Sequence, residues 1–245
     1  MRVTVICPAY PPIPGGVSDF TRRFSVAIAG LGAAVTVITS PGAAADPGVS
    51  VIPEQADWGP RGLWTLLGRI RETRPDVVVL QYVPHLYDRR GFSVWINEFV
   101  PVLRRSGFKV VTIAHELYYG RHEGWKVQPF GLAQRYGLVP MGWGSAKVVL
   151  TVPDRLTRMQ KVFPFWADKF TLLPVGSNLS AASGLDVGAW RRAHGVPDGA
   201  LLGLFMGLAH PSKELPMLTA ALDALAAAGV PARLMVAGGA TIDHP

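Results

Sequence analysis

Residues 2–32 read RVTVICPAYPPIPGGVSDFTRRFSVAIAGLG, and this stretch decides the fold. The apolar run Val3–Cys7 predicts a short strand, and the proline-rich segment Pro8–Gly16 predicts a loop. The apolar residues that follow recur at helical spacing: Val17, Phe20, Phe24, Ala27, Ile28 and Leu31. This spacing is typical of an amphipathic helix packed on a sheet, so the stretch predicts a strand, a turn and a helix.

The loop ends in the pair Gly15-Gly16, where the predicted helix begins. The first N–H groups of a helix lack partners within it and lie at the positive end of its dipole, so they favour an anion. Glycine has no side chain to keep a phosphate away from these amides. A loop glycine pair more often only turns the chain, so the pair alone leaves both interpretations open.

Short apolar segments alternate with helical patterns along the rest of the chain. Beyond the first strand, strands are expected at 35–39, 49–52, 76–80, 109–113, 147–151 and 170–174. Helices are expected at about 63–74, 96–107, 128–141 and 155–162. The alternation predicts an α/β fold with a doubly wound parallel sheet, in which ligands bind beyond the carboxyl ends of the strands.

Polar residues follow two of these strands. Gln81, Tyr82 and His85 come after the strand at 76–80, where they could line a cleft or only form a loop. His115 and Glu116 follow the strand at 109–113. Spacing alone slightly favours a hydrogen-bonded histidine at a strand end over a ligand contact for His115. The second histidine of an H-E-x-x-H motif is missing, so we expect no metal site.

The pattern changes near residue 178. Residues 179–197 are predicted to form a linker, and residues 198–245 the opening βαβ of a second nucleotide-binding half. Its parts are a strand at Leu201–Phe205, a helix at Leu215–Ala228 and a strand at Ala232–Ala237. A complete half needs about 100–150 residues, so the second half is expected to be truncated.

The composition is that of a globular chain with a large core. The 245 residues are 49% hydrophobic and 17% charged, and the formal net charge is +7. Cys7 is the single cysteine, which excludes an intramolecular disulfide. The apolar run before Pro8 is too short for a signal peptide, and no run is long enough to span a membrane, so a cytoplasmic protein is expected.

A basic and aromatic stretch, Arg155–Phe170, suggests a second surface. Mixed cations and aromatic rings can seat on an anionic bilayer, which would make the protein peripheral on the inner membrane face. A solvated helix with a buried aromatic seam is the alternative. The basic balance is compatible with a phosphate-bearing substrate or a membrane, and no nucleic-acid partner is expected.

The stretch from Arg2 to Gly32 resembles the amino-terminal signature of retaining glycosyltransferases of the GT-B fold, glycosyltransferase family 4 (group 1). The segment Phe205–Lys213 is similar to the Gly-Arg…Lys element of that family, in which the two cations hold the donor diphosphate. Lys213 matches, whereas Leu208 stands where the arginine usually lies. Asn178 ends a segment that resembles the Pro-Asn-Gly type found at the family's domain boundary.

The resemblance implies that residues 1–178 are the Rossmann-like amino-terminal domain on the acceptor side. It implies transfer of a sugar, with retention, from a nucleoside-diphosphate donor to an unidentified sugar or lipid-linked acceptor, with no cofactor and no metal. Gly15, Gly16 and Lys213 would bind the donor phosphates, and His115 would contact the sugar or the acceptor. The cleft or acceptor residues would be Gln81, Tyr82, His85, Glu116 and Asn178.

The alternative is a non-catalytic binding or interaction domain derived from such an enzyme. The family carries an E-x7-E pattern in its second half, and this pattern is absent after Lys213. We therefore expect residues 1–245 by themselves to show little or no sugar transfer.

Overall fold

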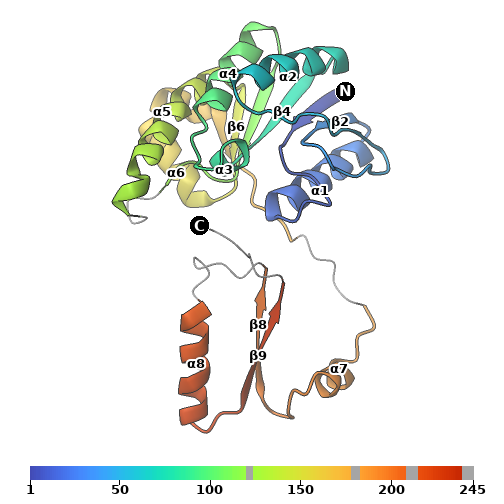
Figure 1. The fold of residues 1–245 in the computed structure, drawn as a ribbon, viewed down its shortest axis with the longest axis vertical. Helices are drawn as coiled ribbons and strands as arrows, with labels where there is room; N and C mark the ends of the chain where they lie inside the picture. Colours follow the sequence, from blue (N-terminus) through green and yellow to red (C-terminus); the bar gives the residue numbers. More distant parts are fainter. Residues whose placement is uncertain (120–123, 178–182, 208–214, 239–245) are drawn as a thin grey trace. The chain divides into compact units, whose positions relative to one another are not determined.

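The computed structural model describes residues 1–119, 124–177, 183–207 and 215–238 (Figure 1). The chain divides into two compact units, Met1–Leu179 and Ser180–Pro245, and each is described by itself.

The first unit is built on a seven-stranded sheet in which every pair of neighbours is parallel. The strands are β1 (Arg2–Ile6), β2 (Ala34–Ile38), β3 (Val49–Ile52), β4 (Val77–Tyr82), β5 (Val110–Ala114), β6 (Lys147–Leu150) and β7 (Phe170–Leu172). Their order across the sheet is β3-β2-β1-β4-β5-β6-β7. The predicted doubly wound parallel sheet is confirmed.

The order of the strands reverses between β1 and β4. The chain moves outward from β1 through β2 to β3, then returns to the other side of β1 and moves outward through β5, β6 and β7. The carboxyl ends of all seven strands lie at one edge of the sheet because the strands are parallel. In open sheets of this kind, ligands bind at that edge, next to the reversal.

Helices cover both faces of the sheet. The helices are α1 (Gly16–Gly30), α2 (Pro60–Thr73), α3 (Pro84–Tyr87), α4 (Val94–Arg105), α5 (Gln128–Gly144) and α6 (Pro153–Val162), with 3-10 turns η2 (Trp125–Val127) and η3 (Pro164–Lys169). One hydrophobic core joins α2, α4, α5 and α6 to the sheet, and a second joins α1 to it. Successive strand residues alternate between these cores, as Leu80 and Val79 do.

Glycines let α5 pack closely against α4. A Cβ added to Gly137 would lie 1.9 Å from Asn97 Nδ2, and one added to Gly144 would lie 2.6 Å from the backbone nitrogen of Pro101. Helix α5 therefore continues to Gly144, beyond the predicted end at Met141 and with Pro140 inside it. Close tertiary packing outweighs the low helix propensity of these residues.

We expect Gly144→Ala to lower the free energy of unfolding by about 1–3 kcal/mol, because backbone of α4 must move to admit the methyl group. Gly68→Ala in α2 is the matched control. A Cβ there meets nothing within 4 Å, so the change should raise stability by up to about 1 kcal/mol. Urea unfolding of both variants measures these changes, and equal stabilities would contradict the close α4–α5 packing.

The second unit contains α7 (Val187–Ala193), β8 (Leu201–Met206), α8 (Leu215–Ala227) and β9 (Ala232–Ala237). The Asp186 carboxylate accepts a hydrogen bond from the Ala189 backbone N–H and so caps α7. Strands β8 and β9 pair in parallel, with α8 between them in the chain. The predicted βαβ succession is thus present.

Candidate functional site

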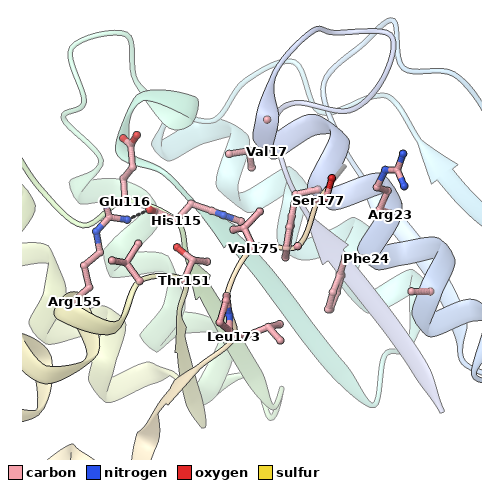
Figure 2. Close-up of a pocket in the computed structure, with 16 residues that line it drawn as sticks. Val17, Arg23, Phe24, His115, Glu116, Thr151, Arg155, Leu173, Val175 and Ser177 are labelled. Atoms are coloured by element: carbon pink, nitrogen blue, oxygen red, sulfur yellow. Dashed lines mark hydrogen bonds between the residues drawn. The ribbon is translucent and has the colours of Figure 1, made fainter. Parts of the chain in front are cut away.

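A pocket of about 850 Å³ opens at the carboxyl edge of the sheet, within the first unit (Figure 2). Helix α1 forms one wall, and the segments that follow β5, β6 and β7 form the other. The side chains and backbone that carry polar chemistry in this lining belong to Gly16, Arg23, His115, Glu116, Thr151, Arg155 and Ser177.

The glycine pair begins α1 at the rim of this pocket. Gly15 precedes the helix with a φ of 158° and a ψ of 147°, and as a glycine it has no side chain to cap the first turn. A Cβ added to Gly15 or Gly16 would meet no atom within 4 Å, so the space around the pair is open. A ligand can therefore approach the first N–H groups of α1 from the side of the glycine pair.

A buried tyrosine holds the proline-rich loop in place. The Tyr10 hydroxyl donates a 2.8 Å hydrogen bond to the Asp46 carboxylate, and the ring is fully buried. Burial and this contact raise the pKa of Tyr10, so it remains a neutral donor. Arg22 of α1 pairs with the same carboxylate at 2.7 Å. These contacts tie the loop to α1 and to the segment before β3, and so fix where the glycine pair lies.

His115 is held from several sides. Its Nε2 lies 2.8 Å from Gln81 Oε1, and its backbone N–H donates to the Tyr82 carbonyl at 3.0 Å. The ring packs edge-on against Phe20 of α1, with centroids 4.7 Å apart. The Arg155 guanidinium donates to the His115 carbonyl oxygen. Strands β4 and β5, α1 and α6 thus converge on this one residue.

Burial, and then the nearby Arg155 cation, lower the pKa of His115 to about 4. The imidazole is therefore neutral at pH 7. Nε2 makes the hydrogen bond with Gln81 Oε1, while Nδ1 has no hydrogen-bond partner among the residues that the structure describes. The neutral ring can therefore offer Nδ1 to a hydroxyl, but it cannot supply a positive charge.

Two arginines make the pocket electropositive. Arg23 comes from α1 on one wall and Arg155 from α6 on the other, with Glu116 as the acid in the lining (Figure 2). The start of α1 adds the positive end of a helix dipole on the first wall. This excess of positive charge suits a ligand that carries negative charge near its hydroxyl groups.

The structure brings together only some of the residues predicted for the site. Gly16, His115 and Glu116 line the pocket, and Gly15 lies next to its rim. Gln81 is fully buried behind His115, and its Nε2 has no partner in the described part of the chain. Asn178 and Lys213 lie outside the described residues.

Two predicted cleft residues lie elsewhere. The Tyr82 side chain is fully buried in the core, where its hydroxyl contacts Ser93 Oγ at 2.9 Å. His85, on the short α3, is exposed and packs against the Tyr119 ring rather than lining the pocket. Over the described ranges, no group of three or more His, Cys, Asp or Glu residues could hold a metal ion.

Sequence reasoning missed several residues of the pocket, among them Phe20, Arg23 and Arg155. Phe20 and Arg23 lie one turn apart on α1, on the face that begins at Gly16, so helical periodicity could have indicated them. Arg155 was assigned to a basic surface stretch. It turns inward to His115, because α6 begins directly after β6 at the same edge of the sheet.

No protein-family model matches the chain, and no curated protein matches its sequence. Solved structures do match its fold. The catalytic domain of starch synthase IV from Arabidopsis thaliana, bound to ADP and acarbose, gives a TM-score of 0.65 at 12% identity, over 98% of this chain and 69% of that one. WaaG, a glycosyltransferase involved in lipopolysaccharide biosynthesis, gives 0.62 at 15% identity, over 96% and 62%.

The trehalose-6-phosphate synthase of E. coli bound with UDP-2-fluoro glucose gives a TM-score of 0.60 at 11% identity, over 98% of this chain and 65% of that one. The first unit has the Rossmann-like fold of a GT-B half. At identities this low, the matches show a shared fold and nothing further. The chain spans 62–69% of the length of these three glycosyltransferases.

The pKa of His115 makes stability depend on pH. Its folded pKa of about 4 lies below the unfolded value of 6.5, so the unfolded chain binds the proton more readily. Neutral His115 therefore contributes stability that is fully present above pH 6.5 and is lost as the pH falls toward 4. Between pH 7 and pH 5, the wild type should lose about 1–2 kcal/mol more unfolding free energy than His115→Gln.

Urea unfolding at both pH values measures this difference, and NMR titration of the imidazole measures the pKa directly. Arg155→Met should raise the pKa of His115 only in part, because burial is the larger cause. An unchanged pH dependence in His115→Gln would show that the histidine is not buried as the structure has it.

Proposed function

We propose that the protein is a retaining glycosyltransferase of family 4 that transfers a sugar from a nucleoside-diphosphate donor. One observation carries the proposal. A single pocket joins the glycine-led start of α1 to a neutral, tightly held histidine at the carboxyl edge of a GT-B half. The bound ADP of the starch synthase and the UDP-2-fluoro glucose of the E. coli protein support a nucleotide-sugar donor.

The donor phosphates would lie against Gly15 and Gly16. A phosphate oxygen can approach the first N–H groups of α1, because neither glycine places a side chain in the open space there. Lys213 would neutralise the leaving diphosphate from the second unit. Stabilising charge that develops on a leaving group is a large part of enzymatic rate enhancement, and this donor set would supply it without a cofactor or metal.

His115 would hold the transferred sugar or the acceptor. Its ring is fixed by Gln81 and Phe20, so little conformational freedom is lost when Nδ1 binds a hydroxyl group. A neutral ring suits this role, because Nε2–H donates to the Gln81 oxygen and Nδ1 is left to accept one hydrogen bond, without repelling Arg155. Glu116, exposed at the rim, would meet the acceptor, which we propose to be a sugar or a lipid-linked sugar.

Gly16→Ala tests the phosphate site. The added methyl group has room in the folded chain, so thermal stability should not fall, but it occupies the space that a phosphate would need. We expect UDP or ADP to bind at least fivefold more weakly, a change of about 1 kcal/mol. Isothermal titration calorimetry with each nucleotide measures the affinity.

Gly30→Ala is the matched control, because it lies at the other end of α1 and also has no atom within 4 Å of the added Cβ. It should leave nucleotide affinity unchanged. Equal affinities for wild type and Gly16→Ala would place the phosphates elsewhere and remove the main support for the proposal.

His115→Ala should lower kcat for transfer or hydrolysis of UDP-glucose or ADP-glucose at least tenfold. The Kd for the free nucleotide should change less than twofold, because His115 contacts sugar or acceptor rather than phosphate. His194→Ala in the second unit is the control. Nucleotide binding without turnover in any of these proteins would favour the alternative of a non-catalytic binding domain.

A further inference from the structure

Helix α5 is apolar on two opposite sides. Arg135 is the one charged residue in its 17 residues, Gln128–Gly144. That arginine turns toward the segment after β5, where it donates to the Tyr119 carbonyl and lies over the Tyr118 ring, 4.7 Å from the centroid. The rest of the helix surface therefore carries no charge of its own.

One side of α5 packs in the core through Gln134, Leu138 and Met141. The other side is exposed, and its residues follow helical spacing. This α5 face consists of Leu132, Tyr136, Val139 and Trp143, with 65%, 63%, 47% and 37% of their surfaces exposed. A helix that is apolar all round is usually covered on every side, so the exposed stripe indicates a surface that something else covers.

Cations border the α5 face. Arg104 and Arg105, at the end of α4, lie over the Trp143 ring at 4.5 Å and 5.0 Å from its centroid, and Arg104 also donates to the Trp143 carbonyl. A shallow groove of about 330 Å³ runs between α4 and α5 beside Tyr136 and Trp143. Glu98 is the one acid in the lining of that groove.

We propose that the α5 face, with Arg104 and Arg105, seats on the surface of an anionic lipid bilayer. Exposed Trp and Tyr rings with an arginine border match the interfacial zone of a membrane, where rings reach the acyl boundary and cations meet acidic headgroups. The charge is complementary, since the chain carries +7 overall. Because one side of α5 packs in the core, the helix would lie in the interface plane with its exposed side toward the lipid. No helix in the described ranges is long and apolar enough to cross a membrane.

The basic stretch Arg155–Phe170 is divided between surface and core, with Arg158, Lys161 and Phe165 exposed. Lys169 donates to the carbonyls of Gly142 and Ser145 at the end of α5, and Phe163 and Trp166 pack against the core. These side chains stabilise the first unit. We assign the membrane surface to the neighbouring α5 face because its exposed side chains form a continuous apolar stripe, and this assignment is independent of the proposed enzymatic function.

Co-sedimentation with lipid vesicles tests the proposal. The wild-type chain should bind vesicles of phosphatidylcholine with about 30% phosphatidylglycerol at low salt, and binding should fall as salt screens the arginines. The variant Leu132→Gln/Tyr136→Gln/Val139→Gln should bind at least tenfold more weakly. Arg105→Gln should weaken binding at low salt but not at high salt.

The control Val26→Gln/Leu31→Gln removes exposed apolar surface at the end of α1, and its vesicle binding should equal that of the wild type. Circular dichroism and thermal unfolding verify that each variant is folded. Two outcomes would overturn the proposal. One is equal vesicle binding by the triple variant and the wild type. The other is no vesicle binding together with a dimer that the triple variant dissociates, which would make the face a contact between copies.

Discussion

The parallel pairing of β4 with β1 on one side and β5 on the other is the constraint on which the site depends. This pairing puts the reversal of strand order beside β1, and it brings the segments after β1, β4 and β5 to one edge of the sheet. The pocket forms at that edge because α1 leaves it on one side and α6 on the other. A helix start and a histidine that are about 100 positions apart in the chain thus face one cavity.

Strand alternation then sorts the residues that follow β4 and β5. Gln81 pairs in register with Ile113, and both point to the α1 side of the sheet, as His115 does two residues later. Tyr82 points the opposite way, into the core below α4. Because Gln81 and His115 point to the same side of the sheet, the Gln81 amide reaches the imidazole. The hydroxyl of Tyr82 instead serves a buried network with Ser93 and Asn97.

The fold could be predicted because its strands are buried on both faces. Runs such as Val77–Leu80 and Val110–Ile113 show no polar alternation, which is typical of central parallel strands. The ends of helix α5 were harder to predict, because Gly137 and Gly144 lower its helix propensity. The close approach of α4 explains why glycine occupies these two positions. Tyr82 could not be placed from the sequence, because the sequence does not show that β4 continues past Leu80.

The candidate site was predictable in part. Gly16 and His115 could be found because each directly follows a recognisable strand or loop. Arg155 could not, because its role depends on the β5–β6 pairing that places the start of α6 beside the His115 carbonyl. The same pairing brings part of a stretch expected on a membrane surface into the pocket and the core, through Arg155 and Met159. The positions of these residues depend on the pairing of strands that are far apart in the sequence, and the local sequence pattern does not show that pairing.

A crystal structure of the protein with a bound nucleoside diphosphate tests the central claim most directly. The account predicts a phosphate oxygen about 3 Å from the backbone nitrogens at the start of α1, with the His115 ring open to the space beside it. A nucleotide bound in the first unit away from Gly15-Gly16, with the pocket beside His115 empty, would contradict the account.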